Sequence, residues 1–270
     1  MKLELNIFIL YTASMEQRAT TPLLGKSDPL PIDVINEDCA SEIVLLCEHA
    51  GRAIPQTLDT LGVSADVVNS HRGWDIGAEE LARALSERLQ APLVLQRYSR
   101  LVVDCNRPPE GDGSMPTLVD NVQIPGNSSL SDTQKAARIE EIFEPMNRAL
   151  TSLFQSRQRR ATFSIHSFTP EMDGEIRPWH AGFLTRKSTA TGKSLMDSIT
   201  QRHPDLVLAL NKPYEICDDT DWFIPRFAES LELPHALIEI RNDQIDHSQG
   251  AAFWAETLTE AIHELMEALA

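Results

Sequence analysis

The chain has few of the features that mark disulfide-stabilised, nucleotide-binding or membrane-spanning proteins. It contains 4 cysteines in 270 residues, far apart and without a CxxC pair. This spacing argues against a disulfide scaffold and favours a reducing cytoplasm, with Cys47 and Cys105 as buried thiols. Neither GxGxxG nor GxxxxGK[ST] occurs, so dinucleotide and P-loop interpretations lack support. No apolar run approaches the ~18 residues of a membrane span.

Basic residues are also scarce relative to acidic ones. The chain has 24 Lys and Arg against 40 Asp and Glu, for a formal net charge of −16. Nucleic acids and anionic membranes both attract basic surfaces, so neither is an expected partner. We expect a small-molecule ligand instead; the sequence carries no signal for an oligomeric state.

The organisation of the chain favours one α/β domain. Residues 1–40 read as a poorly specified lead-in. Within it, Leu5 to Tyr11 faintly resembles the apolar part of a signal peptide, but Glu4 and the lack of a clear small-x-small site argue against one; Met15 is a possible start. Residues 41–270 alternate strand and helix patterns. This alternation predicts a single α/β domain with a mostly parallel or mixed central sheet between helical layers.

The periodicity of hydrophobic residues and the positions of turn residues predict where the strands and helices lie. Strands are predicted at 43–47, 92–96, 101–105, 161–165, 181–185, 206–210 and 236–240, and helices at 76–90, 131–160, 192–203, 220–231 and from 248 onward. Ser131 is the expected N-cap of the longest helix. Residues 108–129 and 169–180 are long irregular stretches, and such loops are often functional.

Two histidines stand at predicted strand ends. His49 closes the first apolar run and His166 closes the run at 161–165. Ligands of open α/β sheets bind at the carboxyl ends of strands, so the two imidazoles could share a metal ion. A catalytic zinc commonly takes a third ligand from a carboxylate. Asp75 and Glu48 are the candidates; Glu48 should point to the opposite side of the sheet from His49, which favours Asp75. The ordinary alternatives are a core imidazole and a helix N-cap.

Glu239 interrupts an otherwise apolar run at 236–240. A carboxylate in such a place is usually paired, bound to metal or catalytic. Burial would raise its pKa, which suits a general base that takes a proton from water. The structural alternative is an ion pair with Arg241, which lies two residues on and on the same strand face.

Arginines gather around the predicted strand at 101–105. Arg100 precedes it, and Asn106 and Arg107 follow it. Because a guanidinium binds carboxylates through two parallel hydrogen bonds, we expect these residues to bind a small anionic substrate. Arg241 and His71 are further candidate substrate contacts. Structural ion pairs to Asp104 are the alternative for at least one arginine.

Four short motifs occur together and in order. They are CEHAG at 47–51, SRLVVDCNRP at 99–108, IHSFTP at 165–170 and IEIRND at 238–243. From about Ser41 to Leu269 the chain resembles the N-formylglutamate amidohydrolase family, which is related in fold to the zinc carboxypeptidases. The resemblance implies a three-layer αβα hydrolase of the carboxypeptidase or phosphorylase/hydrolase type.

The resemblance also implies roles for single residues. His49 and His166 would bind Zn²⁺ or another divalent metal, Glu239 would be the general base, and Asn106 with Arg107 would hold a substrate carboxylate. Residues 72–75 read RGWD, where the histidine-utilisation members of the family carry DTDWH. The third ligand therefore stays open between Asp75 and Glu48.

The expected activity is metal-dependent hydrolysis of a linear amide in a small acidic N-acyl amino acid such as N-formyl-L-glutamate. Glu239 would accept the proton of water. One of the two arginines, Arg100 or Arg107, would stabilise the oxyanion, and the other would bind the substrate carboxylate. Two alternatives are a zinc carboxypeptidase or deacylase acting on peptides, and a non-catalytic binder of an acidic metabolite.

Overall fold

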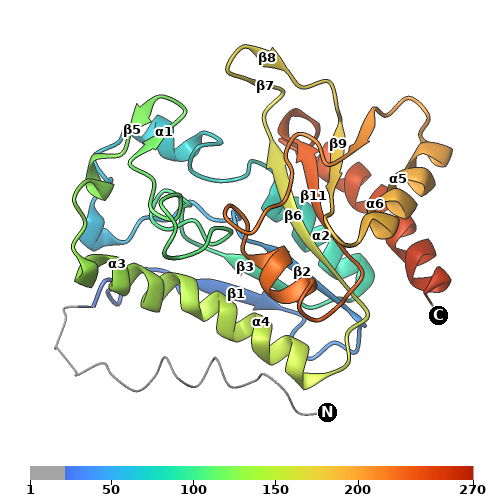
Figure 1. The fold of residues 1–270 in the computed structure, drawn as a ribbon, viewed down its shortest axis with the longest axis horizontal. Helices are drawn as coiled ribbons and strands as arrows, with labels where there is room; N and C mark the ends of the chain where they lie inside the picture. The colour runs from blue at the N-terminus through green and yellow to red at the C-terminus, as the bar shows by residue number, and fades with distance from the viewer. Residues whose placement is uncertain (1–21, 270) are drawn as a thin grey trace.

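A seven-stranded sheet forms the middle layer of the computed structural model, which describes residues 22–269 (Figure 1). The strand order is β1-β3-β2-β6-β11-β9-β10. The strands are β1 (Ile32–Ile35), β2 (Ile43–Cys47), β3 (Leu93–Gln96), β6 (Ala161–Phe168), β9 (Ala181–Leu184), β10 (Leu208–Leu210) and β11 (His235–Arg241). The central strands are almost wholly buried, as their continuous apolar sequences require of strands covered on both faces.

Strand direction defines the functional edge of the sheet. β3, β2, β6 and β11 are mutually parallel, so their carboxyl ends meet at one edge. β1 is antiparallel to β3, while β9 is antiparallel to β11 and parallel to β10. The predicted fold class, a mixed and mostly parallel sheet between helical layers, is confirmed.

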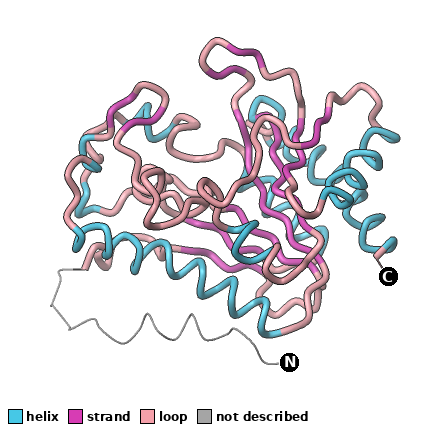
Figure 2. Tube along the Cα trace, in the orientation of Figure 1, coloured by secondary structure: helices cyan, strands magenta, loops and turns pink. Residues whose placement is uncertain are grey.

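Helices cover both faces of the sheet (Figure 2). One apolar core lies between the sheet and α2 (Ala78–Leu89), α5 (Thr189–Arg202) and α6 (Ser248–Ala268). In α2 the buried Leu81, Leu85 and Leu89 recur at the spacing that puts them on one helical face.

A second core lies on the opposite face of the sheet. It is covered by α4 (Glu144–Ser156) and by long loops. α3 (Asp132–Arg138) joins α4 through a π-helical turn, Ile139–Phe143. Shorter elements are α1 (Ala65–Asn69), a π-helical turn at Ile224–Ala228, and 3-10 turns at Gln56–Leu58, Pro125–Asn127 and Asn242–Gln244.

Two short hairpins stand at the top of Figure 1. β4 (Leu118–Val119) pairs with β5 (Val122–Gln123), and β7 (Glu171–Met172) pairs with β8 (Glu175–Ile176). Their two-residue turns, Asp120-Asn121 and Asp173-Gly174, have positive φ at both positions. Asp, Asn and Gly favour such turns, whose twist matches that of paired strands. The hairpins lie in the two stretches that the sequence predicted as long loops.

Three predicted elements are wrong in part. Residues 101–105 form buried turns instead of a strand, because side chains satisfy their carbonyls: Asn127 donates to Leu101 and Arg138 to Val102. The helix predicted at 131–160 is helical without a gap from Asp132 to Ser156 but contains a π-helical turn at Ile139–Phe143, and the helix predicted at 220–231 is reduced to one π-helical turn. Ser131 does cap α3, through a capping box with Gln134.

The start of the ordered chain also differs from the sequence pattern. β1 lies inside the predicted lead-in of residues 1–40 and pairs with β3. Leu23 and Leu24 donate backbone hydrogen bonds to the Glu141 carboxylate, and these contacts further attach this segment. The segment from Leu5 to Tyr11 and Met15 lie outside the described residues.

Two expectations from the composition can be compared with the structure. Cys47 and Cys105 are buried free thiols, as predicted. Within residues 22–269, no helix combines the length and apolar character needed to cross a bilayer.

Candidate metal and active site

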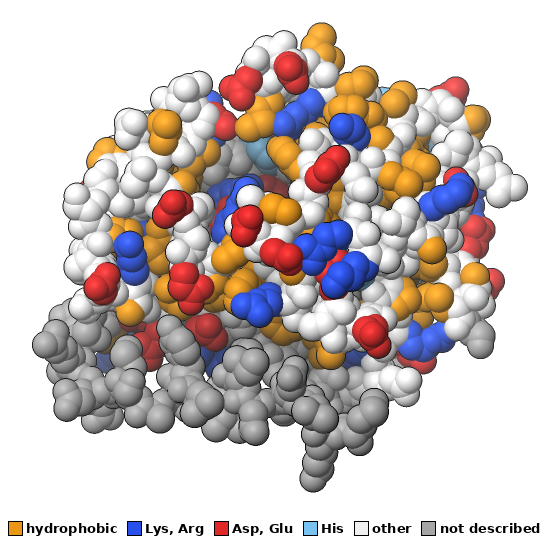
Figure 3. Space-filling view, in the orientation of Figure 1, with side chains coloured by type: hydrophobic (Ala, Val, Ile, Leu, Met, Phe, Trp, Pro, Cys, Tyr) orange, Lys and Arg blue, Asp and Glu red, His pale blue; other side chains and the backbone are white. Residues whose placement is uncertain are grey.

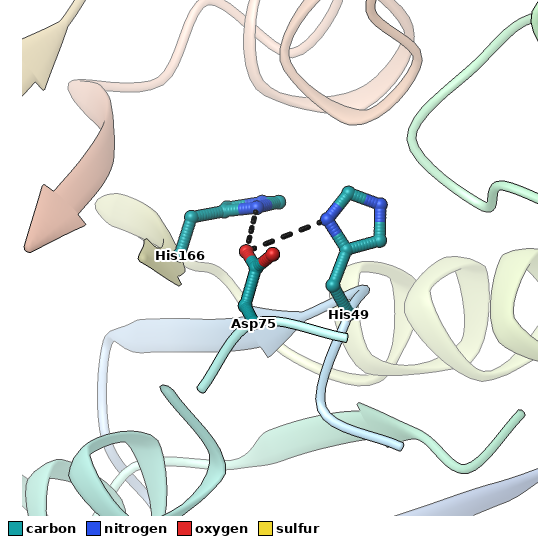
Figure 4. A group of neighbouring side chains, drawn as sticks. All are labelled: His49, Asp75 and His166. Atoms are coloured by element: carbon teal, nitrogen blue, oxygen red, sulfur yellow. Dashed lines mark hydrogen bonds and ion pairs between the residues drawn. The ribbon is translucent and has the colours of Figure 1, made fainter. Parts of the chain in front are cut away.

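His49, Asp75 and His166 meet at the carboxyl edge of the parallel strands (Figure 4). His49 lies two residues beyond the end of β2, His166 lies within β6, and Asp75 lies in the turn before α2. One ligating atom from each side chain lies within 4.8 Å of the other two. The structure thus brings together three residues that are far apart in the sequence.

Each imidazole is held by a further carboxylate on its other side. His49 Nε2 lies 2.7 Å from Asp104 Oδ1, and His166 Nε2 lies 3.0 Å from Glu48 Oε2. On the inner side, His166 Nδ1 is 2.9 Å and His49 Nδ1 is 3.5 Å from Asp75 Oδ2. With a cation bound, a proton on each Nε2, donated to the outer carboxylate, would leave both Nδ1 lone pairs free to bind it. Without a cation, His166 Nδ1 is hydrogen-bonded to Asp75 Oδ2: burial would lower the pKa of His166, but Glu48 and Asp75 outweigh it and raise that pKa.

These donors fit a divalent cation. His49 Nδ1 and Asp75 Oδ1 are buried and lack a hydrogen-bond partner among the described residues. Two neutral imidazole nitrogens and one carboxylate are a donor set that zinc accepts, with a position left open for water or substrate. The outer carboxylates would fix the tautomer and orientation of both rings.

The expected orientation of Glu48 is wrong. Glu48 does not point away from the site: its Oε2 accepts a hydrogen bond from Ser164 Oγ at 2.5 Å and contacts His166. β2 ends at Cys47, so the strand alternation does not extend to His49. Glu48 and His166 therefore lie on the same face of the sheet, and Glu48 supports the ring of His166.

Asp104 is the centre of a cluster of cations. Arg100 donates from Nε and Nη2 to Asp104 Oδ2 at 3.1 and 2.7 Å, and Arg107 Nε lies 3.9 Å from the same oxygen. Burial alone would raise the pKa of Asp104, but Arg100 and His49 outweigh it and hold that pKa well below its usual range. Asp104 is thus an anion that orients both His49 and Arg100.

Glu239 faces the same site from the neighbouring strand. In the parallel register of β11 and β6 it lies opposite His166. Its carboxyl is buried, and Oε2 has no hydrogen-bond partner within residues 22–269. Burial raises the pKa of Glu239 to about 7, although the nearby imidazole of His166 acts in the opposite direction. Such a carboxyl can both accept and return a proton near neutral pH.

Arg241 makes different contacts from those expected. Its Nε donates to Asp243 Oδ1 at 2.8 Å, and its Nη1 contacts the Arg177 and Pro178 carbonyls. It neither pairs with Glu239 nor belongs to the described residues that line the cavity. Arg241 thus links the end of β11 to the loop at 177–178 and to the turn that follows the strand, and its role in substrate binding stays a prediction.

A cavity of about 600 Å³ opens above this group. Figure 3 shows the molecule hollowed there, with basic and acidic side chains inside. The remaining predicted site residues all line the cavity: His49, His71, Asp75, Arg100, Asn106, Arg107, His166 and Glu239. Both hairpins contribute to its wall, through residues such as Leu118 and Met172.

Asn106 and His71 differ in how much of their polar surface is free. Asn106 Oδ1 accepts hydrogen bonds from the backbone of Trp222 and Phe223, so the amide mainly holds the following loop. His71 Nδ1 is buried and lies 3.9 Å from Asp75 Oδ1. Burial lowers the pKa of His71 to about 4, which keeps this imidazole neutral beside the cavity.

Sequence reasoning missed several cavity residues. Arg72, Tyr214 and Asp221 line the cavity, and the sequence assigned no role to any of them. Asp104 was considered only as an ion-pair partner of arginines. Its position in the apolar run 101–105 is the same signal that singled out Glu239, and it could have been used in the same way.

Comparisons with known proteins bear on the family and the fold of the chain. The family model described as N-formylglutamate amidohydrolase matches residues 41–245. The crystal structure of gene product Atu2144 from Agrobacterium tumefaciens is 34% identical with a TM-score of 0.87, over 92% of this chain and 99% of that chain. The N-formylglutamate amidohydrolase of Ralstonia eutropha JMP134 is 19% identical with a TM-score of 0.62, over 89% and 98%, and supports the fold alone. Comparison with curated proteins finds no match.

Proposed function

The chain belongs to the N-formylglutamate amidohydrolase family, and from that premise we propose that it cleaves the amide of a small acidic N-acyl amino acid. It is a hydrolase that acts on a non-peptide C–N amide bond. N-formyl-L-glutamate is the simplest substrate of this proposed class. The products are a carboxylic acid, which is formate in the simplest case, and a free amino acid.

The metal would be held by His49 Nδ1, His166 Nδ1 and the Asp75 carboxylate. When bound there, a divalent cation such as Zn²⁺ supplies a Lewis acid that polarises a carbonyl oxygen and lowers the pKa of water. Asp104 and Glu48 hold the two imidazoles in the tautomer that leaves these nitrogens free to bind it.

Glu239 is the proposed proton carrier. Its free oxygen accepts a proton as water adds to the amide carbonyl, and the same carboxyl returns that proton to the leaving nitrogen. The C–N bond then breaks, and the nitrogen departs as a neutral amine. A carboxylate with the ordinary pKa of 4.5 is a weaker base and would accept a proton from water poorly, so burial of Glu239 is part of the mechanism.

The arginines have separate proposed roles because they stand at different distances from the metal group. Arg100 Nη1 lies 3.6 Å from Asp75 Oδ1, close enough to stabilise an oxyanion formed at the carbonyl. Arg107 lies farther out, and its Nη1 donates to the Thr220 carbonyl at 2.7 Å. The rest of its guanidinium can bind the substrate carboxylate.

One observation carries the proposal. A buried His-Asp-His group and a buried carboxyl with a raised pKa share one cavity with two arginines. A non-catalytic binding protein has no need of an acid that exchanges protons near neutral pH beside a metal group.

Metal analysis and an assay of N-formyl-L-glutamate test the proposal together. The purified protein should bind about one divalent ion per chain and release formate, while Arg107→Ala should raise KM at least tenfold for acidic substrates with a smaller change in kcat. The matched control is Arg83→Ala, because Arg83 pairs with Glu79 and Asp33 outside the cavity. Equal KM values for both variants and the wild type would remove Arg107 as the carboxylate ligand.

A further inference from the structure

The cavity is larger than the simplest proposed substrate requires. About 600 Å³ is a volume typical of sites for drug-sized ligands, whereas N-formyl-L-glutamate carries a one-carbon acyl group. The cavity therefore has room for a longer acyl group, and the chemistry of its walls indicates which kind.

The arginines and the metal group lie at one end of this cavity, and a pair of leucines on β9 and β11 lies at the other. The order of strands is β3-β2-β6-β11-β9 across the sheet. Arg100 and Arg107 follow β3, His49 follows β2, and His166 lies on β6. The cations of the site and the metal group therefore occupy the β3, β2 and β6 side.

Beyond the metal group, an apolar patch lies next to Glu239 in the cavity wall. Leu237 lies two residues before Glu239 on β11, so both side chains share one face and their Cα atoms are roughly 6.6 Å apart. Leu184 pairs directly with Leu237 across β9 and β11. Both leucines line the cavity, and Met172 of the β7–β8 hairpin adds to this apolar wall.

Arg177 is the cation next to this wall, and its guanidinium is already engaged: Nη1 donates to Tyr214 Oη at 2.9 Å and Nη2 lies 2.6 Å from Met172 Sδ, while Arg177 is not among the described residues that line the cavity. Asp221 Oδ1 is 3.4 Å from Asn106 Nδ2, and its Oδ2 accepts from Cys217 N and Thr220 Oγ1, so both oxygens are already used. Asp221 lies with Asn106 and Arg107, whereas Glu239 is an acidic group next to Leu237 and would repel a second carboxylate.

From this arrangement, and resting on the proposed function, we propose that the preferred substrate carries an apolar acyl group of several carbons. Its carboxylate lies toward Arg107, its amide carbonyl lies at the metal group, and its acyl chain lies on Leu184 and Leu237. Water adds to the carbonyl carbon and the C–N bond breaks, so the products are a short fatty acid and a free acidic amino acid.

A homologous series of substrates tests the assignment with the metal-loaded full chain. The series is N-formyl-, N-acetyl-, N-butyryl- and N-hexanoyl-L-glutamate, with release of glutamate as the readout. Each methylene buried on the apolar wall should raise kcat/KM about fourfold. N-succinyl-L-glutamate, whose acyl chain ends in a carboxylate, should be cleaved more slowly than N-butyryl-L-glutamate.

A variant tests the location of the acyl group. Leu184→Phe fills part of the wall and should lower the ratio of kcat/KM for the hexanoyl and acetyl substrates at least tenfold. Leu231→Phe is the matched control, because Leu231 is 47% exposed and does not line the cavity, and its ratio should equal that of the wild type.

The outcomes separate this inference from the proposed function. Cleavage of the formyl substrate with kcat/KM that stays constant or falls along the series overturns the apolar assignment and leaves the proposed function in place. A preference for N-succinyl-L-glutamate over the hexanoyl substrate also overturns the apolar assignment and leaves the proposed function in place. A metal-loaded protein that cleaves no member overturns the proposed function and the inference with it.

Discussion

At the scale of single residues, the site depends on carboxylates that support other side chains. Asp104 contacts both His49 and Arg100, and Glu48 contacts both His166 and Ser164. Each of these acids fixes an imidazole from the side opposite Asp75. The two proposed ligand atoms are therefore oriented before any cation arrives, which reduces the entropic cost of binding it.

Substitution of Asp104 should weaken metal binding without removing a ligand. In Asp104→Asn the amide keeps the shape of the side chain but loses the negative charge that holds His49 and Arg100. We expect metal affinity to fall roughly 10- to 100-fold, as measured by competition with a chelator. Asp112→Asn, an exposed position in the same loop, is the control. Unchanged affinity in Asp104→Asn would show that this carboxylate does not orient the ligand.

At the scale of helices and strands, the sequence predicted the parts whose environment follows from local pattern. Continuous apolar runs in the sequence predicted the strands β2, β6 and β11. The histidines at or near the ends of these runs predicted the position of the candidate site. The run 101–105 was equally apolar, yet it is a buried turn, because buried apolar residues need not be strands when side chains satisfy their carbonyls. The orientation of Glu48 could not be predicted because it depends on where β2 ends.

The cap of α3 offers a test at this scale. Ser131 Oγ accepts from Gln134 N at 3.3 Å, and the Gln134 side chain accepts from Ser131 N at 2.9 Å. Ser131→Ala should lower the free energy of unfolding by about 1 kcal/mol, measured by urea denaturation. The control is Ser128→Ala, since Ser128 precedes the helix and takes no part in this cap. Equal stability of Ser131→Ala and the wild type would contradict the contribution of the cap.

At the scale of the whole molecule, the active site opposes the stability of the fold. The sheet and its two cores bury apolar side chains on both faces, whereas the edge above them buries carboxyl groups, which is costly wherever partners do not compensate the charge. Glu239 is the clearest case, because its free oxygen gains no hydrogen bond in return. The protein thus holds an acid in an unfavourable place, where its chemistry is useful.

The pH dependence of stability should reveal the cost of burying Glu239. Folding raises its pKa from 4.5 to about 7, so its ionised form destabilises the folded state fully above pH 7. As pH falls from 7 to 4.5, that cost disappears because the folded protein takes up the proton more readily than the unfolded chain. In the metal-free protein, Glu239→Gln should therefore be more stable than the wild type at pH 8, by at most about 3 kcal/mol.

Thermal or urea unfolding at several pH values measures this difference. The gain in Glu239→Gln should shrink between pH 7 and 4.5, while Glu171→Gln, at an exposed position in β7, should follow the wild type throughout. A difference between Glu239→Gln and the wild type that does not change with pH would contradict the assignment of the raised pKa to this carboxyl.

The residues directly after β2 limit how this segment can change in length. Glu48 and His49 are consecutive, yet one supports the ring of His166 and the other contacts Asp75 and Asp104. An insertion or deletion of one residue here would displace both side chains at once and disturb both imidazoles. Neither hairpin has two consecutive side chains that support different imidazoles. Changes in loop length that reshape the cavity are therefore far better tolerated in the hairpins than at the end of β2.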